Sequence, residues 1–190
     1  MTKATLQREL NSGRLTMERR DRLVKVVLAH PELIGPLLEF IAQEDQEGTF
    51  NASWVFDNAV RKGLHPLLPH LDRFTEIVPS LVSESCIRPM AHCCELLVLA
   101  YFKKKDDSVR KYMNETHLEV IAATCFDWLI GTHKVAAKVF AMTSLLYLGQ
   151  AFDWIHAELR PVLEATIAQG TAGYRHRAKK TLDQLHAWGR

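Results

Sequence analysis

The chain has 190 residues, of which 47% are hydrophobic and 24% charged, and its net charge is +2 at pH 7. This length allows one domain with a continuous core, and the composition excludes a disordered or fibrous chain. A net charge this close to neutral also argues against a dedicated nucleic-acid-binding protein, which would be strongly basic.

Neither the amino-terminal segment nor the longest uncharged run indicates contact with a membrane. The first ten residues, MTKATLQREL, contain no apolar stretch of the length that a secretory signal needs. The longest uncharged run, residues 139–152, contains Gly149 and Gln150 and is shorter than the ~20 apolar residues that cross a bilayer. We therefore expect a cytoplasmic protein with no membrane partner. The chain has four cysteines, all inside apolar, helix-like segments: Cys86, Cys93, Cys94 and Cys125. In the cytoplasm such cysteines stay reduced and act as core residues.

In chain order, apolar residues recur with the 3.6-residue period of α-helices, and no sustained alternation typical of strands interrupts them. Ten helices are predicted, at about residues 3–11, 16–30, 31–43, 50–62, 66–78, 84–104, 115–130, 133–148, 153–169 and 173–188. The polar residues 103–111 are expected to form a loop. Glycine follows four of the periodic stretches, which predicts left-handed helix ends, at Gly63, Gly131, Gly149 and Gly170.

An internal similarity links two of these segments. Residues 30–43, HPELIGPLLEFIAQ, and residues 156–169, HAELRPVLEATIAQ, share seven of fourteen residues without a gap. Their offset is three units of 42 residues, within the ~40–47 residue period of HEAT and armadillo repeats. Chance similarity between two amphipathic helices is the alternative explanation.

The repeat period predicts an all-α protein that folds as a right-handed α-α superhelix of HEAT or armadillo type. Each unit is a pair of helices that buries its apolar face only by stacking on its neighbours. We expect residues 1–190 to form a single domain, in which residues 1–30 supply amino-terminal capping helices and residues 31–190 about four helix pairs.

Several short stretches resemble a small bacterial family of about this length with a HEAT-like helical-repeat fold. They are His65-Pro-Leu-Leu-Pro-His-Leu-Asp72 with Phe74, Arg88-Pro89 with Ala91, Cys94 and Glu95, Lys134-Val-Ala-Ala-Lys138 with Ala141 and Met142, Asp153-Trp-Ile155 with Glu158-Leu159, and Arg177-Ala-Lys179. Members of that family often carry the label adenylosuccinate lyase. The residues argue against that activity, because the nearest string to the lyase's serine-rich catalytic loop, residues 83–90, lies at a predicted helix start.

Candidate metal and nucleophile chemistry fails on spacing. His65 and His70 are separated by a gap close to that of a zinc site, but no paired cysteines accompany them. The chain contains neither a Gly-x-Ser-x-Gly nor a phosphate-binding Gly-x₄-Gly-Lys sequence. We therefore expect no metal, no cofactor and no catalytic residue of these classes.

The segment Trp54-Val-Phe-Asp57 supports one alternative function. Alkylpurine DNA glycosylases built from HEAT-like repeats use a tryptophan and a nearby aspartate on a concave helix, and Trp54 and Asp57 resemble that pair. The spacing differs from the family's Trp-x₃-Asp, and residues 31–60 carry six acidic and no basic residues where DNA would lie. A core tryptophan beside a solvated aspartate is the simpler interpretation.

A basic row is the main candidate site. In HEAT-like stacks the second helix of each pair lines the concave face, so residues at equivalent positions come into register. Cations and one histidine occupy such positions near the starts of three predicted second helices: Arg88, His92, Lys134, Lys138, Arg175 and Lys179. They could instead be solvated charges or intramolecular partners of Glu95, Asp127 and Asp153.

The leading hypothesis is a non-enzymatic helical-repeat module whose concave face binds a macromolecular partner through an acidic peptide or a phosphate-bearing ligand. A protein partner is expected, with nucleic acid as the weaker alternative. A homodimer through the exposed end of the stack is kept open, because closed symmetric dimers are common.

Overall fold

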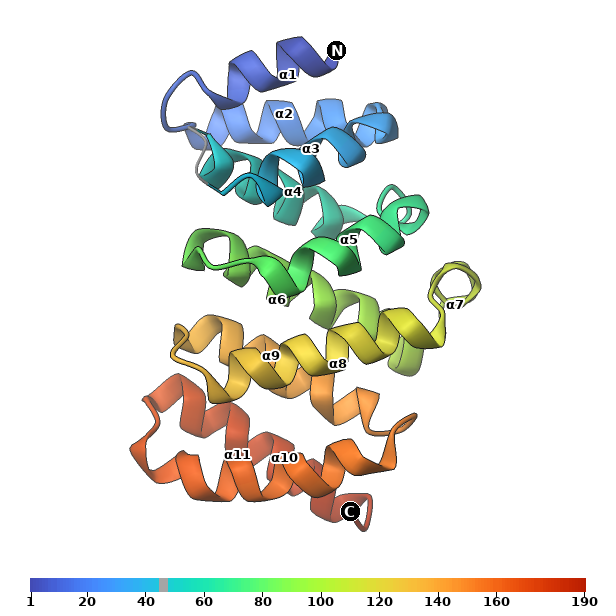
Figure 1. Cartoon of the computed structure of the whole chain (residues 1–190), viewed down its shortest axis with the longest axis vertical. Coiled ribbons are helices and arrows are strands. Elements are labelled where there is room, and N and C mark those ends of the chain that lie inside the picture. The colour runs from blue at the N-terminus through green and yellow to red at the C-terminus, as the bar shows by residue number, and fades with distance from the viewer. Residues whose placement is uncertain (45–47) are drawn as a thin grey trace.

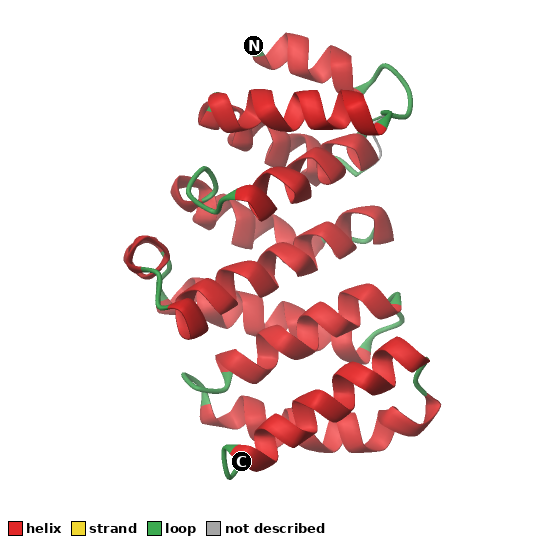
Figure 2. Ribbon diagram, turned by 180° about the vertical axis from the view of Figure 1, so that it is seen from behind, coloured by secondary structure: helices red, strands yellow, loops and turns green. Residues whose placement is uncertain are grey.

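The computed structural model describes residues 1–44 and 48–190, and every regular element in these residues is a helix (Figures 1 and 2). The chain is therefore all-α, as its periodicity predicted. The described residues form eleven α-helices: α1 (Lys3–Leu10), α2 (Met17–Ala29), α3 (Ile34–Ala42), α4 (Thr49–Lys62), α5 (Leu71–Ile77), α6 (Glu84–Val98), α7 (Asp107–Tyr112), α8 (Glu115–Ile130), α9 (Val135–Leu148), α10 (Asp153–Thr166) and α11 (Ala172–Ala187).

The helices stack as antiparallel pairs in two layers, with the two termini at opposite ends of the stack (Figure 1). Helices α2, α4, α6, α9 and α11 pack on one another in succession and form what we call the second-helix layer. Helices α1, α3, α5, α8 and α10 cover one side of it and form the first-helix layer. One cluster of buried apolar side chains runs through the stack, since each pair buries its apolar face against its neighbours. The right-handed superhelical twist and the HEAT assignment stay predictions.

The two similar sequence segments occupy comparable places in this stack. Residues 30–43 contain α3, residues 156–169 contain most of α10, and both helices belong to the first-helix layer. Their aligned leucines are buried in both segments, Leu33 and Leu37 in the first and Leu159 and Leu163 in the second. The shared leucines therefore perform the same packing task at the two ends of the stack.

Helix α7 was not predicted, because residues 103–111 were expected to form a loop. The side chain of Asp106 accepts hydrogen bonds from the backbone N–H groups of Ser108 and Val109, at 2.9 and 3.2 Å. This cap starts a helix of six residues, and Val109 on its inner side is 1% exposed. One buried side chain and one capping aspartate are enough to order a segment whose composition is mostly polar.

The prediction of left-handed glycine ends was wrong at all four positions. Gly63, Gly131, Gly149 and Gly170 have negative φ angles. Three of them are required for space instead. A Cβ on Gly131 would lie 2.7 Å from the Asp127 carbonyl oxygen, one on Gly149 would lie 2.1 Å from the His156 ring and one on Gly170 would lie 2.4 Å from the Tyr174 ring. Close packing of neighbouring atoms, rather than a left-handed backbone, explains these three glycines.

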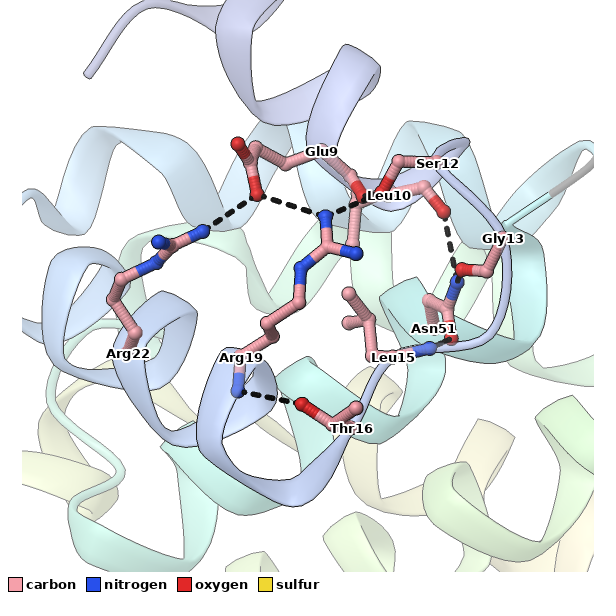
Figure 3. Close-up of polar contacts among 9 residues, drawn as sticks. All are labelled: Glu9, Leu10, Ser12, Gly13, Leu15, Thr16, Arg19, Arg22 and Asn51. Carbon is pink, nitrogen blue, oxygen red and sulfur yellow. Dashed lines mark hydrogen bonds and ion pairs between the residues drawn. The ribbon is translucent and has the colours of Figure 1, made fainter.

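The amino-terminal pair is tied to α4 by one buried asparagine (Figure 3). Asn51, which is 4% exposed, donates hydrogen bonds from Nδ2 to the carbonyl oxygens of Leu10 and Gly13, at 2.8 and 2.9 Å. Its Oδ1 accepts from the N–H of Leu15 at 3.2 Å. The side chain thereby satisfies three backbone groups of the turn between α1 and α2, which fixes the capping pair on the stack.

A shared carboxylate links α1 and α2. Glu9 Oε2 accepts from Arg19 at 3.2 Å and from Arg22 at 2.8 Å, as Figure 3 shows.

Gly48, which caps the start of α4, has a φ of +87° and leaves no room for a side chain, because a Cβ would lie 2.4 Å from the Leu10 carbonyl oxygen. Only glycine satisfies both requirements at this position.

The four cysteines are buried as free thiols, in agreement with their expected role in the core. Burial raises the pKa of the Cys93 and Cys94 thiols well above the ordinary value. Among the described residues, no helix combines the length and apolarity needed to cross a membrane.

Candidate binding surface on the second-helix layer

The two layers carry opposite charge. The first-layer helices hold ten Asp or Glu against four Lys or Arg. The second-layer helices hold twelve Lys or Arg against six Asp or Glu. The net charge near zero of the whole chain is thus the sum of a positive second-helix layer and an acidic first-helix layer. The acidic layer covers one side of the positive layer and leaves its other side uncovered.

Two of the six predicted residues, Arg88 and His92, lie one turn apart on α6. Arg88 is exposed and makes no ion pair with the described residues. His92 is not free: its Nδ1–H donates to Asp57 Oδ1 at 2.6 Å, and its ring stacks on Phe140 with centroids 4.6 Å apart. His92 therefore joins α4, α6 and α9, and a ligand would have to displace Asp57 to reach Nδ1.

Lys134 and Lys138 lie at the start of α9. Lys134 is exposed just before the helix, and its backbone N–H donates to Glu84 Oε2 at 3.1 Å. Lys138 lines a cavity of about 530 Å³ together with residues of α8 and α10, including Val162. Because this cavity contains first-layer residues, it opens at the junction between the layers and not on the uncovered face.

Arg175 and Lys179 are exposed on α11, but they leave the helix on a different side from Arg177 and Lys180. At about 100° per residue, Arg175 and Arg177 diverge by about 160°, and Lys179 and Lys180 by about 100°. Only Arg177 and Lys180 line a cavity with α6 and α9. The six predicted residues therefore do not form one continuous row, because the rotation of α9 and α11 about their axes separates them.

The cavity at Arg177 is the best-formed site on the uncovered face. Its volume is about 350 Å³, and all its lining residues come from α6 with its π-helical extension, Leu99–Lys104, and from α9 and α11. The charged and polar lining groups belong to Glu95, Lys103, Thr143, Tyr147, Arg177, Lys180, Thr181 and Gln184. Leu99 and Leu146 complete the wall.

Arg177 is held in place from two helices. Its Nη1 lies 3.5 Å from Oε1 of Glu95, which is 8% exposed, and the same nitrogen donates to Oγ1 of Thr143. Lys103 and Lys180, also at the cavity, make no ion pair with the described residues. The site thus combines one braced guanidinium with two unpaired ammonium groups, an arrangement suited to an anion.

Arg177 and Lys180 are not among the six predicted site residues, although both stand within the stretch that carried the basic-row hypothesis. Their three-residue spacing places them on one side of a helix, together with Thr181 and Gln184. The buried Tyr174 and Ala178, which face the core, could have indicated the orientation of α11 and hence the exposed cations. Of the acidic partners considered for the six predicted residues, Glu95 contacts Arg177 and Asp153 pairs with Arg190 at 3.1 Å, and neither of these arginines is one of the six.

Trp54 and Asp57 are neighbours on α4, but both already have partners. The guanidinium of Arg20 lies over the Trp54 ring at 4.5 Å, and Asp57 holds His92. Asp57 is 8% exposed, so its interpretation as a solvated aspartate was wrong. Neither residue lines the cavity at Lys138 or the cavity at Arg177.

The described residues contain no group of three or more His, Cys, Asp or Glu side chains that could hold a metal ion. A comparison with models of known protein families, a search of curated proteins and a search of solved structures each found no match to this chain.

Proposed function

We propose that this chain is a helical-repeat binding module that holds an acidic segment of a partner protein across the uncovered face of its second-helix layer. The observation that carries the proposal is the separation of charge between the layers. The second-layer helices carry twelve basic against six acidic residues, and this balance favours the approach of an acidic chain to that layer.

The cavity at Arg177 supplies the strongest contact for such a segment. A carboxylate that enters it meets Arg177, Lys103 and Lys180. Further along the face, Arg88 on α6 is exposed and unpaired among the described residues. A segment that extends from α11 toward α6 therefore meets cations on both helices.

The acidic first-helix layer strengthens selectivity. Ten acidic against four basic residues on those helices repel an acidic segment, so the segment has one favourable face and one unfavourable one. The same acidic layer disfavours the wrapping of nucleic acid around the stack, since phosphate backbones seek positive surfaces.

The test is binding of a fluorescein-labelled peptide of about ten residues rich in glutamate, followed by fluorescence anisotropy at low and high salt. We expect saturable binding that weakens strongly as ionic strength rises, and no binding of a lysine-rich peptide of equal length. No saturable binding of the acidic peptide at low salt, or equal binding of both peptides, would contradict the proposal.

The DNA glycosylase and adenylosuccinate lyase alternatives have no observation in their favour. A glycosylase needs its aspartate available to a flipped base, whereas Asp57 holds His92 at 2.6 Å and is 8% exposed. The segment that the lyase label would require as a mobile catalytic loop, residues 83–90, begins α6 and packs in the core through Cys86, Ile87 and Met90.

A further inference from the structure

The guanidinium of Arg177 is fixed through one nitrogen and offers the other two. Nη1 contacts both Glu95 and Thr143, while Nε and Nη2 make no hydrogen bond with the described residues. The Nε and Nη2 edge of an arginine is the one that forms paired, parallel hydrogen bonds with carboxylate or phosphate oxygens. Glu95 and Thr143 therefore orient Arg177 and leave its binding edge unused.

Three further polar groups in the wall of the cavity are available to a ligand. The hydroxyl of Thr181, the phenolic oxygen of Tyr147 and the side-chain amide of Gln184 line the cavity, and none of them makes a hydrogen bond with the described residues. A hydroxyl or an amide N–H without a protein partner can donate to the oxygens of a bound anion. The wall therefore offers several donors to a ligand with several acceptor oxygens.

The charge of the cavity distinguishes between the two common anions. Lys103, Arg177 and Lys180 supply three positive charges, and Glu95 supplies the one negative charge among the lining residues. The balance of two positive charges exceeds what a single carboxylate neutralises. A phosphate monoester carries about −1.5 to −2 at pH 7 and presents three strong acceptor oxygens, which matches both the charge and the donors.

We infer that this cavity binds the phosphate monoester of a phosphorylated serine or threonine in the partner's acidic segment. The inference rests on the proposed function, because the acidic segment is what brings the phosphate to the second-helix layer. Arg177 contributes the paired hydrogen bonds, Thr181 donates from its hydroxyl, and Lys103 and Lys180 neutralise the remaining charge. Phosphorylation of the partner then controls its capture.

The experiment compares three peptides of one acidic sequence that carry serine, phosphoserine or glutamate at the central position. We expect the phosphoserine peptide to bind at least about tenfold more tightly than the serine peptide, with the glutamate peptide between them. Arg177→Lys keeps the charge but removes the paired hydrogen bonds, so it should weaken binding of the phosphoserine peptide more than binding of the serine peptide and reduce the phosphoserine preference severalfold. Arg175→Lys, on the same helix but outside the cavity, should change neither value.

Thr181→Val gives a second variant of nearly equal shape, and it should also lower the preference for phosphoserine. Equal affinity of the serine and phosphoserine peptides would overturn the inference and leave the proposed function standing. Failure of all three peptides to bind would overturn both. A further control is competition by free O-phosphoserine or inorganic phosphate. If either competes with an affinity equal to that of the phosphopeptide, the cavity is a site for small phosphorylated molecules, and this result would also overturn the inference.

Discussion

Replacement of Asn51 by alanine should release the amino-terminal helix pair from the stack. The substitution removes three hydrogen bonds, to the Leu10 and Gly13 carbonyl oxygens and from the Leu15 N–H. At about 1 kcal/mol net for each bond, with an added cost for backbone groups left buried without partners, the loss is about 2–4 kcal/mol. Such a change is a large share of the stability of a domain of this size.

The assay is urea denaturation combined with hydrogen exchange of the backbone amides in α1 and α2. The matched control is Asn58→Ala on the same helix, because the Asn58 side chain makes one hydrogen bond with the described residues, to the Trp54 carbonyl oxygen within α4 at 2.8 Å. We expect the control to lose less than about 1 kcal/mol. Equal losses in the two variants, or unchanged exchange in α1 after Asn51→Ala, would refute the assignment of Asn51 as the connection between the terminal pair and α4.

Three further predictions concern packing, pH and DNA. Gly149→Ala places a Cβ against the His156 ring and should lower the free energy of unfolding, measured by thermal denaturation, by about 1–3 kcal/mol. Gly63→Ala is the control, because no atom lies within 4 Å of the added Cβ, and it should not show this packing loss. Arg73 donates hydrogen bonds to Glu39 and lowers the pKa of that carboxyl group from 4.5, so the pair stabilises the fold above pH 4.5 and its contribution disappears as the pH falls through the lowered pKa. Glu39→Gln should therefore remove this part of the decline in melting temperature between pH 6 and 3. An unchanged decline in this variant would contradict the prediction. Incubation with methylated duplex DNA should release no base, and release that Asp57→Asn abolishes would establish the glycosylase alternative instead.

The helices could be predicted from sequence because their apolar periodicity and their caps agree. Thr16 and Thr171 accept hydrogen bonds from the third residue beyond them at the starts of α2 and α11, where the pattern predicted helix starts. Helix α7 escaped prediction because six residues cannot display a period, and its existence depends on Asp106 and Val109. The glycines were misinterpreted because three of them are constrained by atoms that an added Cβ would meet, namely the Asp127 carbonyl oxygen, the His156 ring and the Tyr174 ring.

The candidate site could be predicted only as far as the second-layer helices that carry it. Basic residues occur on several sides of α11, namely Arg175, Arg177, Lys179 and Lys180, so spacing alone offered more than one cationic stripe. Packing of Tyr174 and Ala178 against the core decides which stripe meets α6 and α9. The bracing of Arg177 by Glu95 joins residues 82 positions apart, and no local pattern encodes such a contact.

The measurement that tests the account most directly compares two double variants of α11 for binding of the acidic peptide. Arg177→Gln with Lys180→Gln removes two charges from the cavity, and Arg175→Gln with Lys179→Gln removes the same charge from the other side of the helix. The account predicts a loss of affinity of at least about tenfold for the first pair and less than about twofold for the second. Equal losses would show that only net charge matters, and they would contradict a specific site on the second-helix layer.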